Sequence, residues 1–141
     1  MKHNKYTQYY SGTKKIYRES YFINSLLHRE DGPAEIYYYR NGNIKCEHYY
    51  IKGKSYREDG PAAIFYYENG NIKIEYYYIN GNSHRENGPA DIWYYENGSI
   101  KCEYYFINGK QLTKEQFDKY IRRKQMKELD KLIEKEFSWH L

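Results

Sequence analysis

Hydrophobic and polar positions repeat along this 141-residue chain with a period of 28 residues. The stretch HREDGPAEIYYYRNGNIKCEHYYI begins at His28, and close versions of it begin at Tyr56 and His84. Positions that carry the same residue in all three versions are Gly32, Gly60 and Gly88, Pro33, Pro61 and Pro89, and Lys45, Lys73 and Lys101. Self-similarity at a fixed period is typical of repeat architectures.

The repeat defines the expected domain organisation. The three full units are 28–55, 56–83 and 84–111, and a degenerate cap at 6–27 precedes them, because its residues from Ile16 to Leu27 match only the second half of a unit. Terminal repeats are usually atypical, since they cap a stack. Residues 1–112 are therefore predicted to form one repeat domain, and residues 113–141 a C-terminal amphipathic helix.

Each unit predicts a β-hairpin. Two runs of strand-forming residues, such as AEIYYYR and NIKCEHYYI, are joined by Asn41-Gly42 and its equivalents. Asn-Gly favours a two-residue type I′ turn, in which both central residues have φ > 0. A second turn follows at Lys52-Gly53, and a Gly-Pro-Ala segment leads into the next unit. Turns this dense leave no room for helices inside the units.

The expected two-residue turn fixes which side chains share a face. It pairs Tyr39 with Ile44 and Tyr37 with Cys46 on an apolar face, and it places Lys45 and Glu47 in a charged ladder on the other. One hairpin cannot bury its own face, but several in a row form a continuous sheet. The predicted fold class is an all-β repeat: an elongated twisted antiparallel meander sheet of about seven or eight strands, built of stacked β-hairpins, with a C-terminal α-helix.

The hydrophobic period changes abruptly at Thr113. Thr113 with Gln116 three residues later is a capping-box pattern that predicts a helix start. Apolar residues then follow at helical spacing, namely Phe117, Tyr120, Ile121, Leu129, Leu132, Ile133 and Phe137. We expect a helix from about 114 to 136, bent or broken near Gln125. Its apolar stripe is expected to pack on the last unit and cover the open sheet edge.

Composition changes this picture in one respect. The chain contains 21 tyrosines, and aliphatic residues are scarce, so aromatic rings must supply most of any core. The mean hydropathy of −1.13 is low enough to raise disorder as a question. The aromatic content and the regular pattern argue against disorder. Tyrosine suits a thin sheet because its ring packs like that of Phe while its hydroxyl reaches water or a backbone group.

The net charge of +4 is local to one segment. Residues 113–127 hold six basic and two acidic side chains, whereas residues 128–141 hold two lysines and four acidic side chains. The chain therefore lacks the uniformly basic surface that is expected of a general nucleic-acid binder. A basic first half also opposes the helix macrodipole. The arrangement is expected to serve a partner, or to match charges on the sheet.

Two cysteines indicate the compartment. Cys46 and Cys102 occupy equivalent positions two units apart. Four strand spacings of about 4.8 Å would separate them by roughly 19 Å, too far for a disulfide. They are predicted to be free thiols in a reducing, cytoplasmic location. No run of 18 apolar residues and no apolar leader is present, so neither a transmembrane helix nor a secretory signal is expected.

Catalytic motifs are not found in the sequence. It contains no HExxH, CxxC, GxSxG or P-loop pattern. His28 and His84 are replaced by Tyr56 in the middle unit, which favours a structural role in the loop. The acidic pair Glu58-Asp59 becomes Glu86-Asn87 in the last unit, which argues against acid–base catalysis. We therefore expect no enzyme activity, no cofactor and no metal site.

One loop position leaves two interpretations open. Arg29, Arg57 and Arg85 are each followed by Glu. They would either form a local Arg–Glu pair that braces the turn or provide a row of guanidinium groups for an anionic partner.

The unit resembles a known family. The pattern DG-x-x-x-x-YY-x-NG-x-I-K-x-E-x-YY-x-NGK is similar to the MORN-type repeat, in the variant found in bacterial antitoxin-like repeat proteins. The linked form with HRE-D/N-GPA resembles viral arrays, those of giant DNA viruses, and arrays of some bacteria. The resemblance covers about residues 13–112. It implies a scaffold role, of which neutralising a partner protein is one form.

The function hypothesis is a non-enzymatic protein–protein interaction or scaffold module. Tyr and Arg are common in binding hot spots. The candidate partner-binding residues are Tyr49, Tyr77, Tyr105, Lys45, Lys73, Lys101, Tyr120, Arg122, Arg123, Lys124 and Lys127. The alternative is a peripheral binder of anionic membrane or nucleic acid through the basic part of the helix. Self-association through the open N-terminal edge of the sheet is a further expectation.

Overall fold

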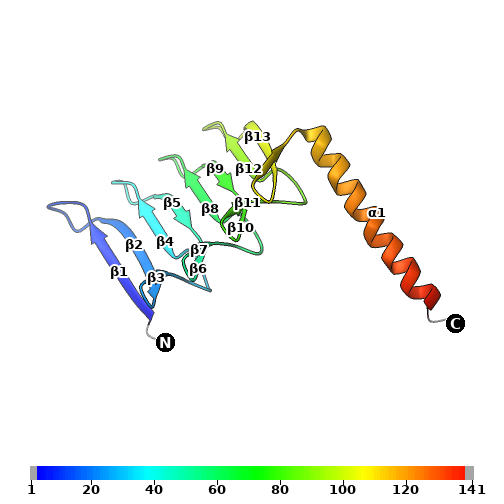
Figure 1. Ribbon diagram of the computed structural model, residues 1–141. Coiled ribbons are helices and arrows are strands. Elements are labelled where there is room, and N and C mark those ends of the chain that lie inside the picture. Colours follow the sequence, from blue (N-terminus) through cyan, green and yellow to red (C-terminus); the bar gives the residue numbers. More distant parts are fainter. Residues whose placement is uncertain (1–2, 139–141) are drawn as a thin grey trace.

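The computed structural model describes residues 3–138. It contains an antiparallel sheet whose strands follow one another in sequence order, and one C-terminal helix, α1 (Lys114–Ser138) (Figure 1). The strands along the sheet are β1 (His3–Tyr9), β2 (Ile16–Ile23), β4 (Glu35–Tyr38), β5 (Ile44–His48), β8 (Ala63–Tyr66), β9 (Ile72–Tyr76), β12 (Asp91–Tyr94), β13 (Ile100–Ile107) and β14 (Lys110–Leu112). The predicted antiparallel meander with a C-terminal helix is confirmed, although nine strands follow one another along the described sheet and not the expected seven or eight.

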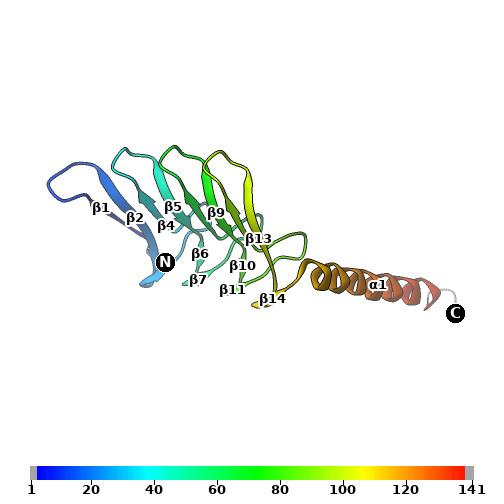
Figure 2. The ribbon, with the colours of Figure 1, turned by 90° about the horizontal axis from the view of Figure 1, so that it is seen from above.

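Short strand pairs follow the long hairpins. β3 (Leu26–Leu27) pairs with the end of β2. The others are β6 (Tyr50–Ile51) with β7 (Lys54–Ser55) and β10 (Tyr78–Ile79) with β11 (Asn82–Ser83). Figure 2 shows these short pairs along one margin of the sheet, with the turns of the long hairpins along the other. The chain therefore crosses the sheet twice in each unit.

The turn of each long hairpin differs from the predicted type I′ turn. The Tyr39 N–H donates to the Asn43 carbonyl at 2.8 Å, which encloses a three-residue loop. Gly42 in that loop has φ 93°, whereas Asn41 does not adopt a left-handed conformation. A three-residue loop that ends in a left-handed residue is the next most common hairpin connection. The type I′ geometry occurs instead in the second turn, where Lys52 and Gly53 have φ 49° and 76°.

A β-bulge lies beside the three-residue loop of every long hairpin. Tyr37 pairs with Cys46 as predicted, but Tyr38, and not Tyr39, pairs with Ile44, so Lys45 is the extra residue. A bulge interrupts the alternation of side chains along a strand. The predicted Lys–Glu ladder is therefore wrong: the Lys45 Nζ lies 5.8 Å from the centre of the Tyr39 ring. The Glu47 carboxylate accepts a hydrogen bond from the Tyr66 hydroxyl at 2.7 Å.

The N-terminal segment forms a long hairpin of the same kind. β1 pairs with β2 along its length, and the register shifts between Gln8 and Tyr9 as it does in the other hairpins. The second turn of this segment is left-handed at Asn24 and Ser25, with φ 46° and 65°. Ser25 therefore adopts a conformation that glycine adopts in the three later units.

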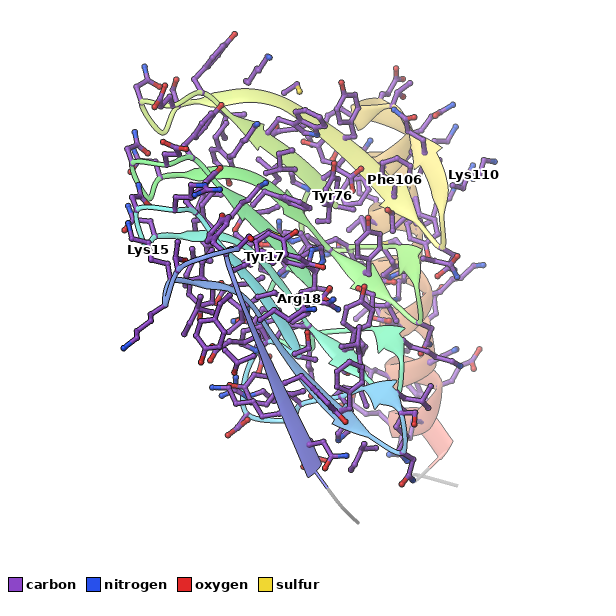
Figure 3. All side chains as sticks on the ribbon, turned by 90° about the vertical axis from the view of Figure 1, so that its left-hand side faces the viewer. Lys15, Tyr17, Arg18, Tyr76, Phe106 and Lys110 are labelled. Carbon is purple, nitrogen blue, oxygen red and sulfur yellow. The ribbon has the colours of Figure 1, made fainter. Side chains whose placement is uncertain are left out.

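Buried residues lie on both sides of a single-layer sheet, and Figure 3 shows side chains covering each side. The equivalent residues Ile36, Ile64 and Ile92 are buried on one side. On the other side, rings meet edge to face across neighbouring strands. Their centres lie 5.6 Å apart for Tyr17 and Tyr37, 5.4 Å for His48 and Phe65, and 6.0 Å for Phe65 and Tyr76. Equivalent alanines fill the tightest positions, and Ala34, Ala62 and Ala90 are fully buried.

The helix begins as the sequence predicts and runs without a break. The Gln116 N–H donates to the Thr113 Oγ1 at 3.2 Å, and the Thr113 N–H donates to the Gln116 Oε1 at 3.0 Å. These reciprocal bonds confirm the capping box. The expected break near Gln125 is wrong, because α1 is continuous from Lys114 to Ser138.

Only the first turns of α1 touch the sheet. Phe117 is 5% exposed, and its ring centre lies 4.8 Å from that of Tyr105. Lys124 forms an ion pair with Glu86, in the loop before β12. Beyond these contacts α1 extends away from the sheet (Figures 1 and 2). The expectation that the apolar stripe packs on the last unit is therefore wrong for every apolar residue after the third turn.

Candidate interaction surfaces

The predicted tyrosine ridge is engaged within the chain. Tyr49 and Tyr77 are half-buried, and the guanidinium carbons of Arg57 and Arg85 lie 4.1 Å and 3.8 Å from their ring centres. Burial raises the pKa of both tyrosine hydroxyls, an effect larger than that of the nearby glutamates. Tyr105, the third member, packs on Phe117. These three tyrosines brace the units and the helix, which leaves little of each ring for a partner.

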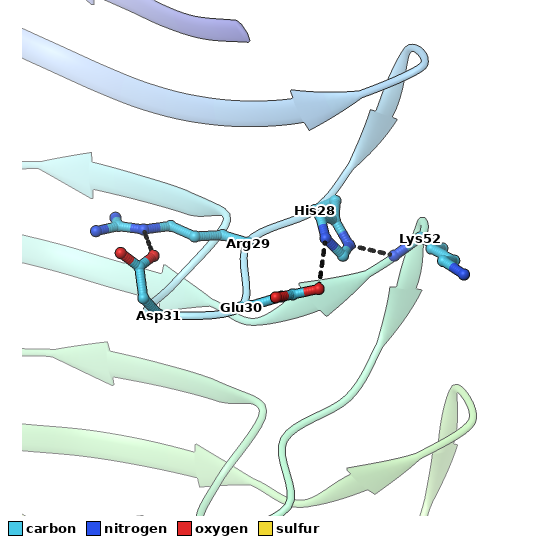
Figure 4. A network of polar contacts seen from close by, with 5 residues as sticks. All are labelled: His28, Arg29, Glu30, Asp31 and Lys52. Atoms are coloured by element: carbon cyan, nitrogen blue, oxygen red, sulfur yellow. Dashed lines mark hydrogen bonds and ion pairs between the residues drawn. The ribbon is translucent and has the colours of Figure 1, made fainter. Parts of the chain in front are cut away.

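The arginines of the loops also make internal contacts, as Figure 4 shows for the first unit. The Arg29 Nε donates to the Asp31 Oδ1 at 2.8 Å, and the Arg29 guanidinium lies 4.2 Å from the centre of the Tyr21 ring. Arg85 likewise donates to Asn87 at 2.9 Å. The loop is braced, but the partner is two residues on and not the adjacent glutamate.

The adjacent glutamate faces the loop histidine. The His28 Nε2 lies 3.6 Å from the Glu30 Oε1, and the His28 Nδ1 accepts a hydrogen bond from the Lys52 N–H at 3.1 Å (Figure 4). His84 accepts from the Asn108 N–H in the same way, at 3.0 Å. Each of these histidines therefore holds the second turn that follows it, which is a structural role.

Other tyrosines connect one unit to the next. The Tyr10 hydroxyl donates to the Tyr38 carbonyl at 2.7 Å, and Tyr39 donates to the Tyr66 carbonyl at 2.7 Å. Tyr67 donates to the Tyr94 carbonyl at 2.8 Å. The equivalent Tyr95 lies at the end of the series and is exposed, and within residues 3–138 its hydroxyl has no hydrogen-bond partner. The series thus ends in an unused donor.

The predicted lysines form an exposed row. Lys45, Lys73 and Lys101 each lie over a tyrosine ring of their own hairpin, at 5.8, 5.5 and 5.8 Å from Nζ to the ring centre. None of the three forms an ion pair with another described residue. Their charges remain available on the side of the sheet that carries the aromatic contacts.

The helix carries a series of exposed apolar side chains. Five side chains along its distal half are solvent-exposed, with exposed fractions of 59% for Met126, 50% for Leu129, 61% for Leu132, 43% for Ile133 and 71% for Phe137. Monomeric soluble proteins rarely expose large contiguous apolar patches. Leu129, Leu132, Ile133 and Phe137 were expected to be buried against the last unit, whereas Met126 was not part of the predicted stripe.

The predicted helix residues have different environments. Lys124 is bound to Glu86, and this ion pair raises the pKa of its ammonium group. Arg122, Arg123 and Lys127 are exposed and form no ion pair with other residues in the described range. Tyr120 is partly exposed. The structure thus separates the predicted site into two regions: the row of lysines on the sheet, and the helix.

No family model, curated protein or solved structure matches this chain. The similarity to MORN-type repeats therefore remains a prediction. No helix within residues 3–138 combines the length and the apolar character that crossing a bilayer requires. Among the same residues, no group of histidine, cysteine and acidic side chains is arranged to hold a metal ion.

Proposed function

We propose that this chain is a non-enzymatic protein–protein interaction module whose sheet presents α1 to a partner protein. The observation that carries the proposal is the set of five exposed apolar side chains on the part of α1 that extends beyond the sheet. Apolar side chains on a part of a helix that has no contacts within its own chain are normally covered by another helix or by a groove. Phe117 and Lys124 hold the base of the helix to the sheet, so its direction is fixed before a partner binds.

In this proposal the 28-residue units are MORN-like repeats that stack into an elongated, twisted array, and the array is a scaffold. The same bulge in every long hairpin and the tyrosine bonds between successive units support this view. A scaffold built of units that contact only their neighbours separates its two ends by a defined distance. The free lysine row is then a second, weaker contact surface.

The charge around the apolar residues favours a protein over an anionic membrane or nucleic acid. Leu129, Leu132, Ile133 and Phe137 lie in the part of α1 that carries four acidic side chains and two lysines. An anionic surface would repel that part of the helix, while the basic part has few exposed apolar side chains. The candidate basic residues Arg122, Arg123, Lys124 and Lys127 are also few for strong binding to nucleic acid.

The test is a pull-down from host lysate with the full chain as bait. The lysate is treated with nuclease, and the capture is repeated at low and at high salt. One variant, Leu129→Asp with Ile133→Asp, removes the apolar surface. A matched variant, Arg123→Glu with Lys127→Glu, changes the exposed basic residues instead. Because all four side chains are exposed, neither variant should unfold the chain.

We expect a stoichiometric protein that survives high salt, is retained by the basic-residue variant and is lost with the apolar-surface variant. Loss with the basic-residue variant and with salt would favour the anionic-surface alternative. Capture that neither variant changes would contradict a role for the helix.

A further inference from the structure

The helix has one side bound to its own sheet and an opposite side that is free. At 3.6 residues per turn, Phe117 and Lys124 lie roughly 150° around the helix axis from the centre of the opposite side. That opposite side, which we name the outer stripe, consists of Arg122, Met126, Leu129, Ile133 and Glu136. All five side chains are exposed. A second helix could therefore lie along the outer stripe without displacing the contacts of Phe117 and Lys124 with the sheet.

The two ends of the outer stripe carry opposite charges at equal distances from its middle residue. Leu129 stands at the centre, and Arg122 and Glu136 lie seven residues on either side of it. Met126 lies three residues before Leu129 and Ile133 four residues after it, both exposed. A basic end, an apolar middle and an acidic end, spaced equally about one leucine, form a surface complementary to its own reversed copy.

We propose that α1 pairs antiparallel with α1 of a second copy of this chain, with Leu129 of the two copies in contact at the two-fold axis. This proposal rests on the proposed function and names its partner. Arg122 of each copy then meets Glu136 of the other, and Met126 meets Ile133. The interface is isologous, so each of these contacts occurs twice.

The charges specify the antiparallel orientation. In a parallel pair, Arg122 would face Arg122 and Glu136 would face Glu136, and like charges across a helix interface disfavour that arrangement. The antiparallel pair also sets the more basic half of each helix beside the more acidic half of the other. This explains why the order of charges along α1 opposes its own macrodipole.

The length of α1 is consistent with this pairing. Residues 122–136 span about 21 Å at a rise of about 1.5 Å per residue. Figures 1 and 2 show this part of α1 outside the sheet, so each sheet would lie beyond an opposite end of the helix pair. Two helices that overlap by about four turns bury less than the roughly 1,200 Å² of a standard stable interface. The dimer is therefore expected to dissociate in the micromolar range.

The test is a charge exchange measured by sedimentation velocity with the full chain, from low micromolar to several hundred micromolar. Arg122→Glu alone and Glu136→Arg alone each place like charges at both ends of the interface. Each is expected to weaken dimerisation at least 10-fold. The double variant, Arg122→Glu with Glu136→Arg, restores both ion pairs and is expected to dimerise like the unmodified chain.

An equimolar mixture of the two single variants gives the sharpest result. The glutamate introduced in one variant then meets the arginine introduced in the other, and the unchanged Glu136 meets the unchanged Arg122. The mixture is therefore expected to form a heterodimer although each variant alone is largely monomeric. Arg123→Glu, at an exposed position outside the outer stripe, is the matched control and is expected to leave dimerisation unchanged. Circular dichroism of each variant confirms that the fold is retained.

Two outcomes overturn the proposal: an unmodified chain that is monomeric throughout, or single variants that the double variant and the mixture do not rescue. The pull-down separates these outcomes from the fate of the proposed function. A monomeric chain that still captures a different protein through Leu129 and Ile133 leaves the function standing and refutes the second copy as partner. A monomeric chain that captures nothing refutes both.

Discussion

The interior of the sheet and its C-terminal end carry the same residues in different roles. Tyr39 and Tyr67 donate hydrogen bonds to the following unit, whereas the equivalent Tyr95 is exposed and its hydroxyl has no partner within the described chain. Cys46 is buried while the equivalent Cys102 is only partly covered. A residue of this repeat is therefore bonded within the chain where another unit follows it and exposed to solvent where none does.

The largest expected effect is a core truncation in the interior. Ile64 is 8% exposed and Ile100, at the free end, is 55% exposed. Ile64→Ala should lower the free energy of unfolding by about 3 kcal/mol, since it leaves a cavity. Ile100→Ala should lower it by less than about 0.5 kcal/mol. Urea denaturation of both variants measures the contrast, and equal losses would show that the end is packed like the interior.

The third unit contains an acidic residue where the second unit has Ala63. Burial raises the pKa of Asp91 to about 6, a change that a hydrogen bond with Ser83 only partly offsets, and its Oδ1 is buried without a hydrogen-bond partner within residues 3–138. Ionised Asp91 therefore destabilises the folded state at neutral pH. Asp91→Ala should raise the free energy of unfolding at pH 7 by about 1–2 kcal/mol, which is a discounted form of 1.36 kcal/mol per pKa unit.

The pH dependence of this gain follows from the sign of the pKa change. Because the pKa of Asp91 is higher in the folded than in the unfolded chain, the folded state binds more protons between about pH 4 and pH 6. The gain from Asp91→Ala should be full above pH 6 and disappear as pH falls to 4. Thermal unfolding of both proteins from pH 4 to pH 7.5 tests this, and a gain that does not vary with pH would refute the buried Asp91 carboxylate as its cause.

Removing a tyrosine hydroxyl compares a bonded position inside the sheet with the equivalent exposed position at its end. Tyr67→Phe removes the bond to the Tyr94 carbonyl and should lower the free energy of unfolding by about 1 kcal/mol. Tyr95→Phe removes the same atom where it bonds nothing described, and should change the free energy by less than about 0.3 kcal/mol. Denaturation midpoints of the two variants decide, and a similar loss from both would show that Tyr95 has a partner in solution.

The smallest effect distinguishes the N-terminal cap from the three full units. Ser25 adopts a left-handed conformation with φ 65°, which disfavours a residue with a Cβ atom. Ser25→Gly should raise the free energy of unfolding by about 0.5 kcal/mol, as relief of strain exceeds the added flexibility of the unfolded chain. The reverse change, Gly81→Ser, in open space at φ 80°, should lower it by a similar amount. Thermal melts that move in the same direction would contradict this account.

Much of the fold could be predicted because each unit repeats its local signals. The Asn-Gly and Lys-Gly turns, the strand-forming runs and the capping box at Thr113 each act over a few residues. The bulge at Lys45 could not be predicted from them. A three-residue loop and a two-residue turn use the same Asn-Gly dipeptide, and the choice between them moves Lys45 from the side of Glu47 to the side of Tyr39.

The environment of the apolar residues of α1 was harder to predict than the fold. Apolar spacing in α1 identifies a helix, but it does not say whether Leu129 and Ile133 face the chain's own sheet. That depends on where Phe117 anchors the helix, because this contact sets the rotation of every later residue. The abundance of tyrosine predicts a binding ridge, but it does not show that Arg57 and Arg85 lie over the rings of Tyr49 and Tyr77.

The bonds that join successive units have a consequence for the length of the molecule. Tyr39 and Tyr67 each donate to a carbonyl 27 residues further along the chain. The same hydrogen bond therefore joins the first full unit to the second and the second to the third. Adding or deleting one 28-residue unit would then leave each remaining join intact and move the two ends by two strand spacings, about 9.6 Å. The number of 28-residue units would therefore set the distance between β1 and the start of α1.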